Sequence, residues 1–217
     1  MKKLLHVVAS PRGEKSRSLK VAKAFLERFR EVHPEWLVDE INVFDETLPH
    51  LTARQVDGKY VLLGGKELYG ELRETWEVIE IQIARFKEAD AYLISTPMWN
   101  FSLPYALKQY LDLLIQPGYL FRYGDNGVEG FLRGRRMVVV SARGGDYRSP
   151  EMRPYDHVQP YLRTILGFIG ITEIDFITVE PLDGVTPAEE AATVSAAQEA
   201  ARTVAATSFV KGVSHGA

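Results

Sequence analysis

The residues of this chain best suited to chemistry lie in segment 95–104, which reads Ser-Thr-Pro-Met-Trp-Asn-Phe-Ser-Leu-Pro. Its two prolines fix the backbone, so the peptide groups are held in place. Met98, Trp99 and Phe101 supply flat or polarizable apolar surface, and Asn100 supplies a donor and an acceptor. This combination suits a planar heterocycle with a polar edge, such as a flavin. The alternative, a connection that packs into the core, accounts poorly for prolines that bracket the aromatic residues.

A second segment combines hydroxyl and basic side chains between an apolar run and a helical pattern. It reads Ser-Pro-Arg-Gly-Glu-Lys-Ser-Arg-Ser over residues 10–18. The first turn of a helix has unpaired N–H groups and a partial positive charge, which suit a phosphate. The segment matches neither the Walker pattern nor the dinucleotide glycine pattern, which favours a monophosphate such as that of FMN. Serines before a helix are also ordinary caps, and Arg12 or Arg17 could be solvated surface.

A third segment, Ser-Ala-Arg-Gly-Gly-Asp-Tyr over residues 141–147, follows another apolar run. Gly144 and Gly145 let the backbone approach a ligand and present N–H groups to it. Such donors at one edge of a flavin would stabilise its reduced, anionic ring without an acid or base. The alternative is a simple turn. Tyr147 could line the substrate space or cover the loop.

These three segments must be positioned by alternating strands and helices. Apolar runs predict strands over residues 3–9, 36–43, 89–96, 135–142 and 171–179. Helical spacing of apolar residues predicts helices over 18–32, 51–65, 67–88, 103–114, 154–168 and 188–210, and glycines at 124, 127 and 130 indicate a hairpin-like excursion. This alternation predicts an α/β, doubly wound five-stranded parallel sheet of order 2-1-3-4-5 between two helical layers. In that order the loops after strands 1, 3 and 4 meet.

Length and composition narrow the classes of protein. The 217 residues fit one domain over 1–210, with 211–217 as a frayed tail. A formal charge of −3 gives no support to a nucleic-acid partner, and no apolar run is long enough to cross a membrane. The absence of cysteine excludes disulfides, thiol catalysis and cysteine metal sites. The apolar run near Met1 lacks a cleavage pattern and is expected to be a strand, so we expect a cytoplasmic protein without a bound metal.

With these motifs in view, the chain resembles the FMN-dependent NADH-azoreductases, also described as NADH:quinone oxidoreductases. The resemblance covers nearly the whole chain. It is clearest in Ser10-Pro-Arg-Gly with Ser16 and Ser18, in Pro97–Phe101 and in Ser141–Gly145, and it extends to 121–123, 126–130 and 166–171.

The resemblance implies a flavodoxin-like fold and a homodimer with two interface active sites. It also implies ping-pong transfer of a hydride from NADH or NADPH through bound FMN to a quinone or azo compound. It implies no catalytic side chain, because the chemistry occurs on FMN. The cofactor-binding residues it implies are Ser10, Ser16, Arg17, Ser18, Pro97, Met98, Trp99, Asn100, Phe101, Ser141, Arg143, Gly144 and Gly145. The pocket-lining residues are Asn100, Phe121, Tyr147 and Phe168, of which Phe121 and Phe168 would cap the partner's site.

Two departures from the family pattern concern Arg17, where the family often has Gln, and Trp99, where it often has Tyr. Arg17 could add charge to a phosphate site or point to solvent, and the segment 146–153 has no counterpart that we can align. Two alternative functions are an NAD(P)H:FMN reductase that releases its flavin and a flavodoxin-type electron carrier. The near-neutral charge and the bulky residues 119–123 disfavour the carrier.

Overall fold

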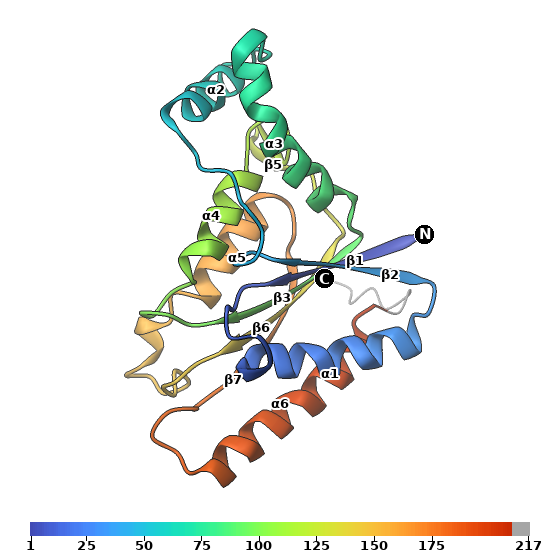
Figure 1. Cartoon of the computed structure of the whole chain (residues 1–217), viewed down its shortest axis with the longest axis vertical. Helices are drawn as coiled ribbons and strands as arrows, with labels where there is room; N and C mark the ends of the chain where they lie inside the picture. Colours follow the sequence, from blue (N-terminus) through green and yellow to red (C-terminus); the bar gives the residue numbers. More distant parts are fainter. Residues whose placement is uncertain (210–217) are drawn as a thin grey trace.

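A parallel β-sheet forms the centre of the computed structural model, which describes residues 1–209 (Figure 1). Its strand order is β2-β1-β3-β6-β7, which is the predicted order 2-1-3-4-5 when the strands of this sheet alone are numbered. The strands are β1 (Lys2–Val8), β2 (Trp36–Asn42), β3 (Ala91–Pro97), β6 (Arg136–Ala142) and β7 (Glu173–Val179). Val8 pairs with Ser95, and Ser95 pairs with Val140, so the carboxyl ends of the three central strands lie at one edge.

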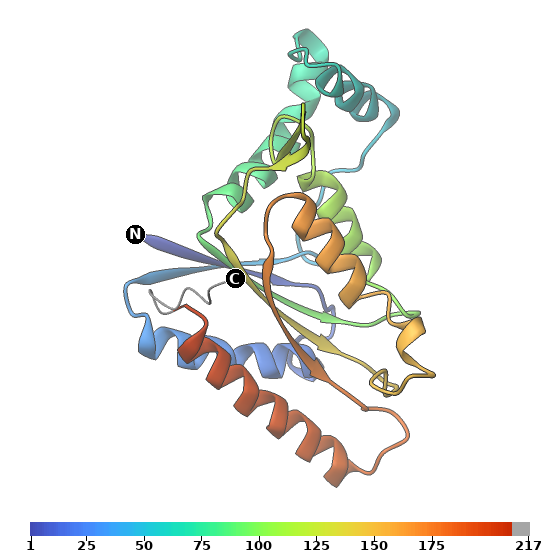
Figure 2. The ribbon, with the colours of Figure 1, turned by 180° about the vertical axis from the view of Figure 1, so that it is seen from behind.

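Helices cover both faces of the sheet, as Figure 2 shows from behind. Strand β1 is apolar on both sides: Leu4 packs toward α1 and α6, whereas Leu5 and Val7 pack toward α3, α4 and α5. A strand buried on both faces is typical of a parallel sheet in an α/β fold. The covering helices are α1 (Arg17–Val32), α3 (Gly70–Glu88), α4 (Tyr105–Leu114), α5 (Gln159–Phe168) and α6 (Pro187–Thr207).

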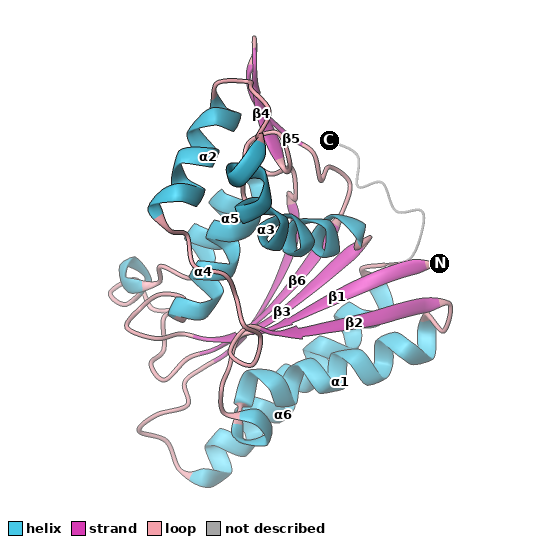
Figure 3. Ribbon diagram, turned by 45° about the horizontal axis from the view of Figure 1, so that its top comes forward, coloured by secondary structure: helices cyan, strands magenta, loops and turns pink. Residues whose placement is uncertain are grey.

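One end of the molecule projects beyond the sheet. It consists of α2 (Ala53–Leu63), the start of α3 and a hairpin of β4 (Phe121–Gly124) and β5 (Gly127–Gly130), visible in Figures 1 and 3. Helix α2 packs closely on α3. Gly58 of α2 lies so near the Trp76 ring of α3 that a Cβ atom at this position would overlap the ring. The Trp76 ring nitrogen donates to the Gln55 carbonyl at 3.2 Å, which fixes the pair.

Several predicted boundaries need correction. The helix predicted over 154–168 is divided: a short 3-10 helix, η2 (Arg153–Tyr155), precedes α5, which begins only at Gln159. The Asp156 carboxylate accepts the Val158 and Gln159 N–H groups at 2.9 and 3.1 Å, and so caps the later start. The helix predicted from residue 67 begins at Gly70, the one predicted from 51 begins at Ala53, and the one predicted from 103 begins at Tyr105. A second short helix, η1 (Gly13–Lys15), precedes α1.

Two further expectations concern the C-terminal tail and membrane-spanning segments. The predicted tail, 211–217, lies outside the described residues. Within the part of the chain that is described, no helix is both long and apolar enough to cross a bilayer.

Candidate functional site

The three predicted segments meet at the carboxyl edge of the sheet, where they enclose a cavity of about 210 Å³. The loop after β1 supplies one wall, the loop after β3 a second, and the loop after β6 a third. Since the carboxyl ends of parallel strands form the ligand site of doubly wound sheets, this cavity lies where such folds bind ligands. Its lining residues are Ser10, Arg12, Ser16, Arg17, Ser18, Pro97, Met98, Trp99, Ala142, Arg143, Gly144, Leu182 and Asp183.

Buried hydroxyl groups and a helix N-terminus form the first wall. Ser10, Ser16 and Ser18 are all nearly inaccessible. Ser16 caps helix α1 by accepting the Leu19 N–H at 3.3 Å, and its hydroxyl lies 3.1 Å from that of Ser18. The N–H groups of the first helical turn have no partner within the helix, and they add a partial positive charge. This set of donors fits a phosphate monoester.

The Arg17 side chain takes neither of the two predicted directions. Its guanidinium pairs with the Glu190 carboxylate of α6 through two hydrogen bonds, of 2.7 and 3.1 Å. These hydrogen bonds raise the pKa of Arg17 and lower the pKa of Glu190 relative to their usual values. The side-chain charge is therefore paired with Glu190, and the backbone N–H of Arg17, the first residue of α1, has no partner within the helix.

The second wall ends in a strained turn. Trp99 and Ser102 exchange two backbone hydrogen bonds of 2.9 Å, and the residues between them, Asn100 and Phe101, have φ angles of 46° and 68°. Positive φ at both central positions defines a type I′ turn, which asparagine tolerates but a bulky residue such as phenylalanine rarely adopts. The turn presents Phe101 with 45% of its surface exposed. Such strain is a recognised mark of a functional segment.

The third wall is held closely against the loop after β7. The Gly144 carbonyl accepts the Leu182 and Asp183 N–H groups at 2.9 and 3.0 Å. A Cβ atom at Gly144 would overlap the Asp183 carboxylate, so a larger residue there would force the Asp183 side chain to move. Tyr147 donates its N–H to Glu180 at 3.0 Å, which anchors the far end of the segment to the end of β7.

Arg143 is buried beneath this wall. Its Nη1 atom lies 3.0 Å from Asp156 and 3.7 Å from Glu180, and its Nε atom donates to the Ser141 hydroxyl at 3.4 Å. The guanidinium therefore points toward α5 and the end of β7. Segment 146–153, which the sequence left unaligned, forms the loop that covers it. In this loop hydrogen bonds from Arg148 lower the pKa of Asp146 to about 2.

Not every predicted residue lines the cavity. Asn100 and Phe101 continue the wall that Trp99 begins, but their side chains are exposed. The Ser141 side chain is buried against Arg143. Phe121 and Phe168 are not in the cavity lining. Their rings pack against each other, with centroids 4.6 Å apart. The residues outside the lining are Asn100, Phe101, Phe121, Ser141, Gly145, Tyr147 and Phe168.

Four lining residues are absent from the predicted site residues. Arg12 and Ala142 lie within the predicted segments 10–18 and 141–147, whereas Leu182 and Asp183 lie outside every predicted segment. These last two follow β7, the edge strand beside β6, so they emerge at the same edge of the sheet as the three predicted loops. Only their position after the edge strand could have pointed to them, because the composition of the sequence after β7 is not unusual.

Comparison with known proteins identifies the family. Residues 2–204 match the family described as having a flavodoxin-like fold. The chain is 40% identical over 206 residues to an FMN-dependent NADH:quinone oxidoreductase of Nitratidesulfovibrio vulgaris, covering 93% of this chain and 98% of that protein. A protein of the same name from Desulfotalea psychrophila is 36% identical, with 83% of this chain and 86% of that protein covered. This chain belongs to the FMN-dependent NADH:quinone oxidoreductase family.

Solved structures agree with this family assignment. An azoreductase from Bacillus anthracis str. Sterne superposes with a TM-score of 0.86 at 28% identity, covering 95% of this chain and 99% of that one. An FMN-dependent NADH-azoreductase from Bacillus anthracis str. Ames Ancestor, solved in complex with FMN, gives a TM-score of 0.82 at 29% identity and covers 94% and 100% of the two chains. The family and the fold that the sequence motifs implied are thereby confirmed.

Proposed function

We propose that this chain binds FMN in the three-walled cavity and transfers two electrons, as hydride, from NADH or NADPH to quinones and azo compounds. The observation that carries the proposal is the convergence of three features at one cavity: a hydroxyl-rich helix N-terminus, the Met98-Trp99 platform and Gly144 of the loop after β6. FMN-dependent oxidoreductases and azoreductases among the relatives support the same assignment.

In this proposal the first wall holds the phosphate. Ser10, Ser16 and Ser18 donate their hydroxyl protons to it, and Arg17 donates its backbone N–H. Water is largely excluded there, because all three serines are buried. A phosphate would replace the contact that now joins the Ser16 and Ser18 hydroxyls with two charge-assisted hydrogen bonds.

The other two walls would hold the ring system. Pro97 to Phe101 would support it, with Asn100 at its polar edge. The N–H groups of Gly144 and Gly145 would donate to its pyrimidine end, and Ser141 and the backbone of Arg143 would complete this wall. Bound FMN supplies the chemistry, since it accepts a hydride and passes one on. The protein positions both reactants and provides donors for developing negative charge, so no catalytic acid or base is assigned.

The co-substrates would take turns in one pocket by a ping-pong mechanism. The two reactants use the same exposed face, and each must leave before the next binds. Asn100, Tyr147 and the partner's Phe121 and Phe168 would line this space in a homodimer. Exposed apolar side chains on α3 and on the hairpin, including Ile81 at 63% and Val128 at 40%, support a dimer contact. We place the enzyme in the cytoplasm, where reduced nicotinamides are available.

The proposal is tested by purification followed by steady-state kinetics. We expect a yellow protein with a flavin absorbance band that persists through gel filtration. NADH and NADPH are then each assayed against one benzoquinone and one azo dye, and parallel double-reciprocal lines are expected for ping-pong turnover. A colourless chain that takes up no FMN contradicts the proposal. Loss of flavin on gel filtration favours an FMN reductase, and bound flavin without quinone or dye turnover favours an electron carrier.

A further inference from the structure

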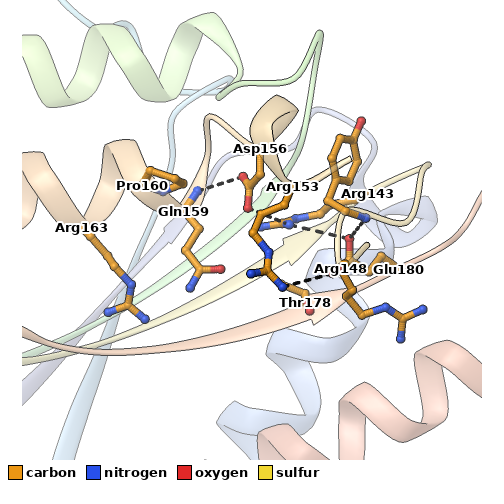
Figure 4. Close-up of a pocket in the computed structure, with 10 residues that line it drawn as sticks. Arg143, Arg148, Arg153, Asp156, Gln159, Pro160, Arg163, Thr178 and Glu180 are labelled. Carbon is orange, nitrogen blue, oxygen red and sulfur yellow. Dashed lines mark hydrogen bonds and ion pairs between the residues drawn. The ribbon is translucent and has the colours of Figure 1, made fainter. Parts of the chain in front are cut away.

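A second cavity, of about 480 Å³, lies on the far side of Arg143 from the flavin site. Figure 4 shows it between the loop after β6, the short helix η2, the first turns of α5 and the end of β7. Arg143 lines both cavities, so its side chain separates them. The lining residues of the second cavity are Arg143, Tyr147, Arg148, Arg153, Asp156, Gln159, Pro160, Arg163, Thr178 and Glu180.

This cavity carries more positive than negative charge. Four arginines line it but only two carboxylates, Asp156 and Glu180, and both carboxylates face Arg143. Arg148 is paired with Asp146 at 2.6 Å. The remaining two arginines are not neutralised in this way.

Arg153 and Arg163 have no carboxylate within ion-pair distance among residues 1–209. Arg153 donates to the Arg148 carbonyl at 3.3 Å, and Arg163 lies 4.6 Å over the Phe176 ring. Figure 4 shows their guanidinium groups on either side of the Gln159 side chain. Two uncompensated guanidinium groups therefore face one cavity.

Arg143, which lines this cavity, has a buried donor atom without an acceptor within residues 1–209. The Nη2 atom of Arg143 has no hydrogen-bond acceptor among the described residues, although Arg143 is only 3% exposed. Buried charged donors without an acceptor are costly, and native proteins rarely leave them so. Because Arg143 lines this cavity, a ligand oxygen bound there would supply an acceptor for this donor.

We propose that this cavity is an anion site for a phosphate group, distinct from the FMN phosphate site. Arg153 and Arg163 would bind the phosphate from two sides, with the Thr178 hydroxyl and Arg143 completing the set of donors. Two uncompensated charges match a phosphate dianion better than a single carboxylate. The positive end of the α5 dipole lies at the same position and acts in the same direction.

The phosphate could come from two sources. It could belong to a free phosphorylated metabolite, or it could be the 2′-phosphate of NADPH reaching over the loop that holds Tyr147. The second source rests on the function proposed above, and the first does not.

The direct test is calorimetric titration of inorganic phosphate into the FMN-saturated protein in a phosphate-free buffer. We expect one site per chain, weakened about tenfold or more in the Arg153→Gln/Arg163→Gln double variant. Arg28→Gln removes one positive charge from α1, outside this cavity, as each single variant does within it, and should leave the phosphate affinity unchanged. Flavin absorbance and circular dichroism confirm that each variant is folded, and the two single variants give intermediate affinities.

Absence of phosphate binding, or equal affinity in the double variant and in Arg28→Gln, would overturn the inference. If the chain does not take up FMN, the titration is repeated in a Ser18→Ala background, so that failure of the proposed function remains distinct. The source of the phosphate is read from KM. A rise confined to NADPH in the double variant identifies the coenzyme, whereas unchanged KM values for both nicotinamides identify a separate metabolite.

Discussion

Arg17 lies in the proposed phosphate loop, yet it contributes little of its charge there. Its guanidinium is engaged by Glu190, a residue of the last helix, through two hydrogen bonds. The proposed phosphate site therefore relies on serine hydroxyls and backbone N–H groups. A glutamine at this position would provide the same backbone donor, which explains how the chain can depart from the family pattern without losing the site.

This assignment predicts a clear order of effects on FMN affinity. Ser18→Ala removes a buried hydroxyl donor to a charged group, so we expect the Kd to rise about tenfold or more. Arg17→Gln leaves the backbone N–H in place and should change the Kd by less than about threefold, since it removes only the partly exposed pair with Glu190. Titration with FMN, followed by quenching of flavin fluorescence, measures both. A larger loss in Arg17→Gln than in Ser18→Ala would show that the guanidinium itself binds phosphate.

Replacing Phe101 can separate the backbone strain of its positive φ angle from the role of its aromatic ring in activity. A residue other than glycine in the left-handed region destabilises the fold by about 1–2 kcal/mol, and glycine removes this cost. Glycine also makes the unfolded chain more flexible, which destabilises the fold by about 0.4–1 kcal/mol. We therefore expect Phe101→Gly to leave the melting temperature nearly unchanged or slightly higher. Loss of the aromatic surface should lower kcat/KM for a quinone about fivefold, equivalent to about 1 kcal/mol.

Thermal unfolding and steady-state kinetics check the two halves of this prediction. Phe101→Tyr keeps the ring and serves as the control, with kcat/KM close to that of the parent. If Phe101→Gly instead lowered the melting temperature strongly and left kinetics intact, Phe101 would be a packing residue only.

At the scale of elements, an ion pair joins helix α3 to the edge strand β2. Arg85 donates to both Asp39 oxygens, at 2.8 and 3.0 Å, and also to the Glu40 carbonyl at 2.7 Å. Hydrogen bonding from Arg85 lowers the pKa of Asp39 below its ordinary value of 3.8. A lowered pKa means that the carboxylate stabilises the fold above pH 3.8, and that this contribution is lost as the pH falls through the folded-state value.

Asp39→Asn should therefore destabilise the protein in a pH-dependent way. We expect a loss of about 1 kcal/mol in the free energy of unfolding at pH 7, nearly the same loss at pH 5, and a shrinking difference below pH 4. Urea denaturation at several pH values measures it. Glu27→Gln, an exposed change on α1, is the control and should stay within about 0.5 kcal/mol. A difference that does not shrink between pH 5 and pH 2 would contradict the role of the charge.

Prediction from sequence succeeded where local patterns determine the outcome. Apolar periodicity located the strands and helices, and the strand order then brought the three loops together. Side-chain direction was beyond reach, because Arg17 and Arg143 are oriented by Glu190, Asp156 and Glu180, which are distant in sequence. The late start of α5 was missed for a similar reason: the helical apolar pattern continues through a short 3-10 helix, and only the Asp156 cap marks the break.

For the molecule as a whole, we expect a second copy of the chain to bind at the projecting end and the adjoining middle of α3. Helix α3 buries Trp76, Ile79 and Ile83 against its own fold but exposes Val78 and Ile81 on another side. Tyr123 and Val128 of the hairpin are exposed as well. Apolar groups gathered on neighbouring elements are typical of interaction surfaces. Phe121 is in the same hairpin, so a contact through this end would bring it toward a partner's site.

Ile81→Glu tests this contact and its link to activity. A charge buried in an apolar interface is strongly unfavourable, so we expect the variant to elute as a monomer in gel filtration with light scattering. If the partner completes the pocket, kcat/KM for a quinone should fall with it, while FMN remains bound by the three loops of one chain. Leu37→Glu, the same change at an exposed apolar residue of edge strand β2, should remain dimeric and active. A monomeric parent protein, or a monomeric Ile81→Glu variant with full activity, would mean that each chain works alone and that Phe121 and Phe168 serve only the packing seen between their rings.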